Sequence, residues 1–130
     1  MREPTWIREL EALTMHAKQL TLFGGSTGVR DRGLLESALA RPKNIRAYGE
    51  GEPSLARLTA AYAFGISANH AFLDGNKRTA LVVSFAFLEV NGFEVTASQQ
   101  DAYQTILGLA AGVVSEDQLA EWFERNTAPR

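Results

Sequence analysis

The chain has 130 residues and a mass of 14.2 kDa, with 45% apolar and 22% charged residues. This length and balance predict one globular domain spanning residues 1–130 and exclude a disordered chain. A net charge of −2 argues against a dedicated nucleic-acid-binding protein, because such proteins carry a basic excess. The absence of cysteine excludes disulfides, zinc–thiolate sites and cysteine nucleophiles, and two histidines leave little for a multi-histidine metal site.

No segment indicates export or membrane insertion. The first ten residues lack the apolar core of a signal peptide. The longest apolar run, residues 80–88, contains Ser84 and is far shorter than the roughly 20 residues that span a bilayer. We therefore expect a cytoplasmic protein that contacts neither membrane nor nucleic acid directly.

The first half of the chain predicts three helices. Apolar residues at spacings of three and four predict a helix over residues 5–22, opened by Pro4-Thr5 and stopped by Phe23 and two glycines. A glycine-rich loop follows, after which Asp31 caps a short helix that ends at Pro42. Residues 43–53 are expected to be loop, with room for one helical turn over residues 45–48. Ser54 then caps a helix that ends near Asn69.

The second half predicts three further helices. An apolar helix runs over residues 76–90 and stops at Asn91-Gly92. Residues 93–96 alternate like a short strand that has no evident partner. Two closing helices span residues 98–111 and 115–126, each opened by serine, and Ser115 with Gln118 matches the capping-box pattern. The fold class is all-α: a single domain of about six helices, whose two central helices are apolar nearly all round and form the core.

The chemistry concentrates in the connection between the two central helices, with sequence HAFLDGNKRT over residues 70–79. Gly75 and Asn76 lie where a loop turns into a helix, so backbone N–H groups without partners form an anion site. Lys77 and Arg78 in the first helical turn oppose the helix dipole and are favourable only if phosphate binds there. A transferred phosphate therefore fits this connection.

Two further side chains of the connection extend this interpretation. Asp74, a hard oxygen ligand beside phosphates, suits Mg²⁺. His70 suits a general base for a hydroxyl nucleophile, since its unperturbed pKa lies near neutrality. Outside the connection, His16 is expected to be a partly buried structural residue. Arg30 and Asp31 are expected to cap a helix and pair locally.

The segment HAFLDGNKR resembles the signature loop of the Fic family, and specifically of its death-on-curing (Doc) branch. The run GVRDRGLLESAL over residues 28–39, Gly24-Gly25 and Asn91-Gly92 are also similar to that branch. The resemblance implies that His70 is the general base, that Asp74 binds Mg²⁺, and that Gly75, Asn76, Lys77 and Arg78 bind the phosphates of ATP. It also implies that the Phe72 ring anchors the loop in the core.

Adenylylating Fic proteins commonly have proline and glycine where this chain has Ala71 and Lys77. In the Doc branch this difference accompanies phosphorylation of a protein threonine, with elongation factor Tu as the target class. The resemblance thus implies a toxin that inhibits translation, together with an antitoxin whose helical C-terminal segment docks in an apolar groove. An AMP transferase that uses the same loop, and a catalytically silent helical binding module, stay open as alternatives.

Overall fold

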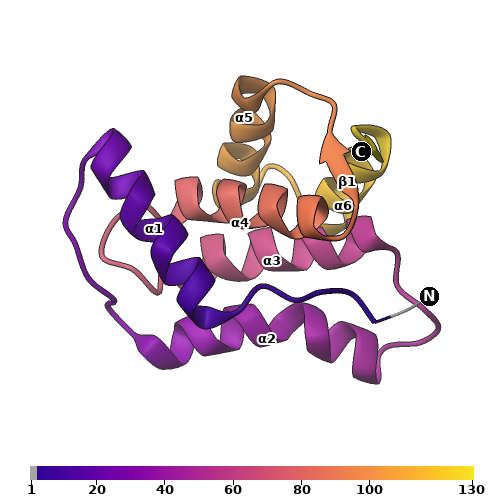
Figure 1. Ribbon diagram of the computed structural model, residues 1–130, viewed down its shortest axis with the longest axis horizontal. Helices are drawn as coiled ribbons and strands as arrows, with labels where there is room; N and C mark the ends of the chain where they lie inside the picture. Colours follow the sequence, from indigo (N-terminus) through magenta and orange to yellow (C-terminus); the bar gives the residue numbers. More distant parts are fainter. Residues whose placement is uncertain (1–2) are drawn as a thin grey trace.

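The computed structural model describes residues 3–130, which form six helices and one two-stranded sheet. The helices are α1 (Glu9–Phe23), α2 (Arg32–Tyr48), α3 (Leu55–Asn69), α4 (Asn76–Val90), α5 (Gln99–Ala110) and α6 (Glu116–Arg125). In Figure 1, α3 and α4 lie side by side in the middle of the molecule, with α2 beneath α3 and α1 crossing at one end. The all-α class is confirmed.

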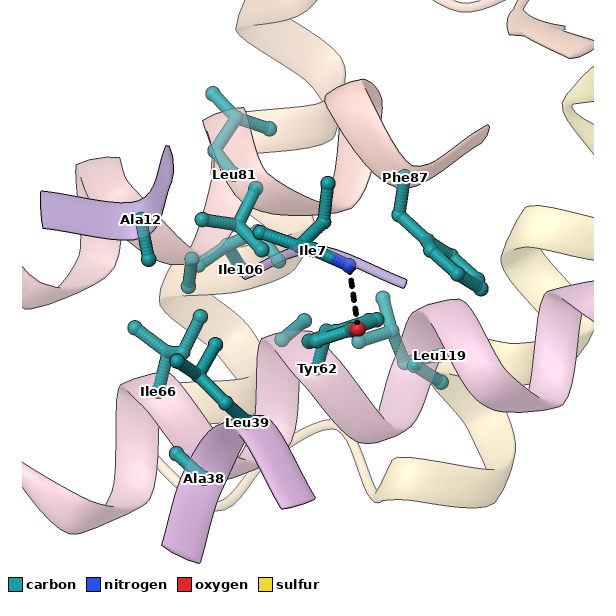
Figure 2. Close-up of a cluster of buried hydrophobic side chains, with 14 of the residues drawn as sticks. Ile7, Ala12, Ala38, Leu39, Tyr62, Ile66, Leu81, Phe87, Ile106 and Leu119 are labelled. Atoms are coloured by element: carbon teal, nitrogen blue, oxygen red, sulfur yellow. Dashed lines mark hydrogen bonds between the residues drawn. The ribbon is translucent and has the colours of Figure 1, made fainter. Parts of the chain in front are cut away.

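The core forms around α3, which packs against α2, α4 and α6. Ten of the fifteen α3 residues are buried, including Leu58, Tyr62 and Ile66. Figure 2 shows Tyr62 and Ile66 in one cluster with Leu81 and Phe87 of α4 and Leu119 of α6. Gly65 permits the close approach of α2, because a Cβ atom at this position would lie 3.1 Å from Cα of Ala38. The predicted core role of both central helices is confirmed.

Local capping signals determine where most helices begin. The side chains of Asp31, Ser54, Ser98 and Ser115 each accept a hydrogen bond from the backbone N–H three residues further on. The capping box predicted at Ser115 and Gln118 is present. These starts are set by bonds within one helical turn, and the sequence predicts them correctly.

The first helix begins later than predicted, at Glu9 instead of residue 5. Tertiary hydrogen bonds hold the preceding residues in an extended path: Tyr62 Oη accepts from Ile7 N, and Asn91 Oδ1 accepts from Thr5 N. Arg8 is the N-cap residue of α1, and the Glu11 side chain accepts a hydrogen bond from the Arg8 backbone N–H. The acceptors lie 55 and 86 residues away, so helical periodicity does not reveal them.

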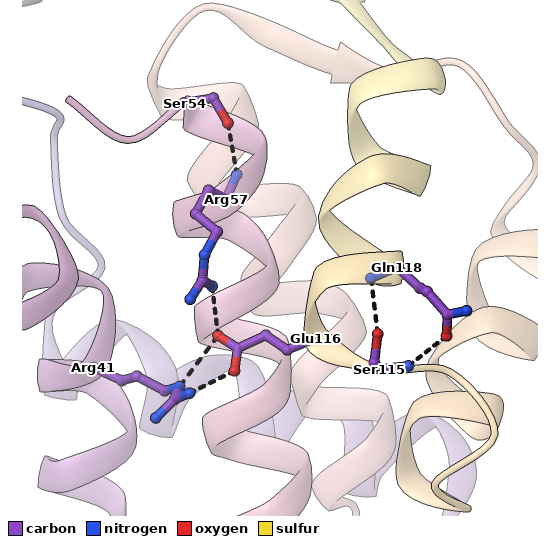
Figure 3. A network of polar contacts seen from close by, with 6 residues as sticks. All are labelled: Arg41, Ser54, Arg57, Ser115, Glu116 and Gln118. Carbon is purple, nitrogen blue, oxygen red and sulfur yellow. Dashed lines mark hydrogen bonds and ion pairs between the residues drawn. The ribbon is translucent and has the colours of Figure 1, made fainter. Parts of the chain in front are cut away.

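The predicted stop at Pro42 is wrong, because α2 continues through this proline to Tyr48. A proline inside a helix removes one hydrogen bond and costs about 3 kcal/mol. Contacts on both sides of Pro42 offset this cost: Arg41 binds Glu116 of α6 (Figure 3), and Ile45 packs against the core. The predicted loop over residues 43–53 is therefore reduced to the connection after Tyr48.

The extended segment predicted over residues 93–96 is confirmed as strand β1 (Phe93–Val95). It pairs antiparallel with β2 (Thr127–Pro129), with Phe93 opposite Pro129. A three-residue strand that contains proline carries no sequence signal, so its pairing was not predicted. The sheet therefore joins β2, near the end of the chain, to β1, which follows α4.

Candidate functional site

The connection between α3 and α4 lies at the same end of the molecule as the connection between α1 and α2 (Figure 1). His70 ends α3 in the left-handed conformation, with φ 50° and ψ 47°, and is the only residue other than glycine with positive φ between residues 3 and 130. Gly75 precedes α4 with φ 81°. These two left-handed residues turn the chain sharply at each side of the loop. His70 itself is exposed.

Phe72 and Asn76 fix the loop from inside. The Phe72 ring is buried, as predicted, at 1% exposure. The buried Asn76 side chain accepts from Phe72 N at 3.1 Å and donates to Phe72 O at 3.0 Å, which closes the loop on itself. This bridge uses the amide oxygen and one amide hydrogen of Asn76. Asn76 is therefore a structural element of the loop, whatever else it binds.

The α1–α2 connection holds the loop from outside. Val29 forms an isolated antiparallel bridge with Phe72, and Leu73 N donates to Gly28 O. Arg30 Nε donates to His70 O at 2.8 Å, and its Nη2 donates to Asn69 O at 3.1 Å. The expected local pairing of Arg30 is wrong: its guanidinium binds the carbonyls at the end of α3, about 40 residues away in sequence. Asp31 caps α2 as predicted.

Asp74 is held at both its backbone and its side chain, although it is exposed. Ser26 N donates to Asp74 Oδ2 at 2.7 Å, and the ring nitrogen Nε2 of His16 lies 2.8 Å from the Asp74 carbonyl oxygen. Gly25 contacts the same side chain so closely that an added Cβ would lie 3.0 Å from Asp74 Cβ. Two segments distant in sequence thus fix where this carboxylate lies.

The N-terminus of α4 is open to an anion. Gly75 provides no side-chain cap, and the first backbone N–H of the helix with a backbone acceptor is that of Thr79, which donates to Gly75 O. Among the described residues, the backbone N–H groups of Asn76, Lys77 and Arg78 meet no backbone carbonyl. Such amides carry the positive end of the helix dipole and bind negative groups.

The two cations of the first α4 turn differ in their surroundings. The Lys77 side chain is exposed. The guanidinium carbon of Arg78 lies 4.1 Å from the ring centroid of Phe23 in α1 and 3.8 Å from that of Tyr103 in α5. The motif gives no sign of this double cation–π contact, which holds the guanidinium against α1 and α5.

A magnesium ion bound at Asp74 would take most of its remaining ligands from groups other than protein side chains. In the part of the chain that the structure describes, no group of three or more His, Cys, Asp or Glu side chains gathers. Mg²⁺ commonly binds through one or two carboxylates, completed by substrate phosphates and water. An exposed carboxylate beside open helix amides fits that mode. In the same residues, no helix combines the length and the apolar character needed to cross a membrane.

The fold and this loop define a class of protein: a helical domain with an exposed histidine, a fixed carboxylate and an open helix N-terminus between its two central helices. The Fic/DOC family model matches residues 6–88 of this chain. The chain therefore belongs to the Fic/Doc family.

Two relatives place the chain near Doc proteins. It is 45% identical to the protein named Toxin Doc of Mycolicibacterium smegmatis over 76 residues, which are 58% of each chain. It is 33% identical to the protein named Protein kinase doc of Escherichia phage P1 over 115 residues, 88% of this chain and 90% of the relative. The resemblance to the Doc branch is confirmed, and the match to the first relative spans little more than half of that protein.

Proposed function

We propose that this protein is a Doc-like toxin that transfers the γ-phosphate of ATP to a hydroxyl group of a cytoplasmic protein. The observation that carries the proposal is the loop at residues 70–78, where an exposed histidine and an aspartate held at both its carboxylate and its backbone carbonyl flank the open amides of α4. A helix connection needs a glycine and a bridging amide such as Asn76, but it does not need the other groups. The names of the two relatives support both parts of the proposal.

The proposed reaction assigns one step to each group. His70 accepts the proton of the target hydroxyl while the oxygen of that hydroxyl attacks the γ-phosphorus. The bond from that phosphorus to the bridging oxygen breaks, and ADP leaves with the electron pair. The amides of Gly75 to Arg78, with the Lys77 ammonium, hold the phosphates in line. The Arg78 guanidinium, fixed between two rings, offers its N–H edge to phosphate oxygens.

Bound at Asp74, Mg²⁺ would neutralise charge on the phosphates during transfer. The fixed position of Asp74 supports this role, since a carboxylate already oriented loses little freedom when it binds a metal. The target hydroxyl is proposed to be a threonine of elongation factor Tu. That part rests on the family resemblance, and its consequence is inhibited translation and growth.

The proposed antitoxin has a candidate docking place close to the loop. A groove of about 330 Å³ lies between α1 and α4 and reaches Gln99 at the start of α5. Its α1 rim carries Leu22 and Phe23, which are 60% and 57% exposed. An amphipathic helix with apolar anchors fits such a groove. Because Arg78 and Phe23 line the groove and contact each other, an occupant would also affect the phosphate site.

The function is tested by offering the protein Mg²⁺ with ATP labelled at the γ- or the α-phosphate, together with a cell extract. Transfer of γ-label to a protein band, identified by mass spectrometry, is the expected result. Transfer of α-label would show AMP transfer, and transfer of neither would show a binding module. Elongation factor Tu that remains unlabelled while another band is modified would contradict the proposed target alone.

Docking is tested by adding the candidate antitoxin segment to the protein. The expected result is a gain of helical circular dichroism in that segment and a loss of label transfer. Replacing Phe23 with Asp should weaken this binding, whereas the same replacement of Val113, an even more exposed apolar residue outside the groove, should not.

A further inference from the structure

His16 is a buried polar side chain at the point where α1 contacts the loop. Its exposure is 5%, and its ring stacks on that of Phe72 with centroids 3.7 Å apart and planes at 9°. A phenylalanine or leucine would fill this space without introducing a polar group. The distance of 2.8 Å from Nε2 to the Asp74 carbonyl oxygen gives the imidazole a specific partner. Because a carbonyl oxygen only accepts, Nε2 carries the hydrogen.

This hydrogen bond determines how the Asp74–Gly75 peptide is oriented. A trans peptide is planar, and its C=O and N–H point to opposite sides. A carbonyl held toward His16 therefore directs the Gly75 N–H away from α1, where it adds to the open amides of α4. Gly75 is left-handed and the residue after it is helical, the backbone pattern that makes successive N–H groups converge on an anion.

The underside of the loop leaves little room for another arrangement. A Cβ atom added at Gly75 would lie 3.3 Å from Leu20 Cδ2 and 3.5 Å from His16 Cδ2. The imidazole thus fills the space below the turn and also binds the Asp74 carbonyl oxygen. Loss of that bond would remove the one contact on the inner side that fixes the direction of this carbonyl, and with it the direction of the Gly75 N–H.

We propose that His16 is a positioning residue that holds the Gly75 amide in the phosphate-binding arrangement through the Asp74 carbonyl. This inference rests on the proposed function insofar as that function makes the α4 N-terminus a phosphate site. The histidine touches neither substrate nor metal. It acts on the orientation of one peptide.

Two substitutions separate the hydrogen bond from the packing. His16→Phe keeps an aromatic ring against Phe72 and removes the N–H. His16→Gln places an amide N–H at the depth of Nε2 and removes the ring. We expect His16→Phe to weaken Mg²⁺–ATP binding by about tenfold to a hundredfold, since misplaced positioning groups typically cost that much. We expect His16→Gln to recover most of this loss, although it is the poorer packing substitute.

Binding is measured by titration calorimetry with Mg²⁺–ATP, and folding by circular dichroism melting. In parallel, the Gly75 amide signal is followed by ¹⁵N NMR as inorganic phosphate or ATP is added. The wild-type signal should move with ligand, and the His16→Phe signal should not. A merely structural role predicts the reverse order of the variants, with His16→Gln the more impaired in stability and in binding. If His16→Phe does not fold, His16→Asn is compared with His16→Gln, since its shorter amide should not restore binding.

The outcomes distinguish this inference from the proposed function. A folded His16→Phe protein that binds ATP and shifts its Gly75 amide as the wild type does would overturn the positioning role. So would a wild-type Gly75 amide that ignores both ligands, whatever the transfer assay shows. Binding that depends on His16 in a protein that transfers no label would overturn the proposed reaction and leave the positioning role intact.

Discussion

His70 ends α3 in the left-handed region, so a residue that replaces it must adopt positive φ as well as lack a base. Asparagine tolerates this region better than alanine, and its amide cannot take a proton. If His70 is the base of the proposed reaction, both His70→Ala and His70→Asn should lower phosphate transfer by about 10²–10⁴-fold, because a general base contributes mainly in the transition state. Binding of Mg²⁺–ATP should stay nearly unchanged. Single-turnover rates and calorimetry measure the two quantities, and a variant that keeps most of its activity would show that His70 is not the base.

Lys77 is the residue at which this chain departs from the glycine of adenylylating Fic proteins. Lys77→Gly should widen the amide site and weaken γ-phosphate transfer, and a gain of AMP transfer would be the stronger result. Lys77→Ala is the matched control, since it removes the ammonium without freeing the backbone. Labelled ATP distinguishes the two reactions. If the proposed γ-phosphate transfer proceeds at the wild-type rate in both variants, the lysine does not select the reaction.

At the scale of elements, one carboxylate joins three helices. Glu116 in the first turn of α6 accepts from Arg41 of α2 at 2.5 Å and from Arg57 of α3 at 2.6 Å (Figure 3). Its side chain is 12% exposed, so water screens these contacts less than it would on an open surface. Glu116 also lies where the helix dipole favours negative charge. This cluster fixes α6 against α3 and against α2 at Arg41, the residue just before Pro42.

Replacing Glu116 therefore should destabilise more than replacing a surface carboxylate. We predict that Glu116→Ala lowers the free energy of unfolding by about 1–3 kcal/mol, because it leaves two partly buried guanidinium groups without their shared acceptor. Glu121→Ala on the same helix is the control and should stay within about 0.5 kcal/mol of wild type. Urea denaturation measures both. Equal effects of the two substitutions would mean that the cluster adds no stability.

At the scale of the whole molecule, the N-terminal segment is tied to the core through Tyr62. The Tyr62 hydroxyl accepts from Ile7 N at 2.9 Å (Figure 2), and burial raises the pKa of Tyr62 to about 12. In the unfolded chain the phenol ionises near pH 10. Tyr62 therefore stays protonated to a higher pH in the folded state than in the unfolded state. The stability that this group contributes is present below pH 10 and is lost as the pH rises toward 12.

We predict that part of the loss of stability between pH 10 and 12 disappears in Tyr62→Phe, which has no phenol to ionise. At neutral pH the same variant should be less stable by about 1–3 kcal/mol, since the buried Ile7 N–H loses its acceptor. Thermal or urea unfolding across this pH range measures both effects. Tyr48→Phe is the control, since Tyr48 is 85% exposed. Identical pH profiles for wild type and Tyr62→Phe would contradict the assignment.

The sequence by itself determined the features that depend on neighbouring residues. The four cap residues Asp31, Ser54, Ser98 and Ser115 fix helix starts through bonds within one turn. The two central helices are recognisable because they are apolar all round. The loop HAFLDGNKR stands out because its polar groups exceed what a helix connection needs. All-α class, core and candidate site follow from such local information.

Tertiary structure alone decided which distant groups hold the loop and the helix ends. His16, Arg30 and Ser26 reach the loop from 40 to 58 residues away. Helix α2 passes through Pro42 because Arg41 and Ile45 find partners in other elements. Each of these outcomes depends on a hydrogen bond or a contact formed only after the helices pack. Periodicity and caps report the preferences of a segment, whereas the partner of a buried polar group is set by whatever the fold brings within about 3 Å.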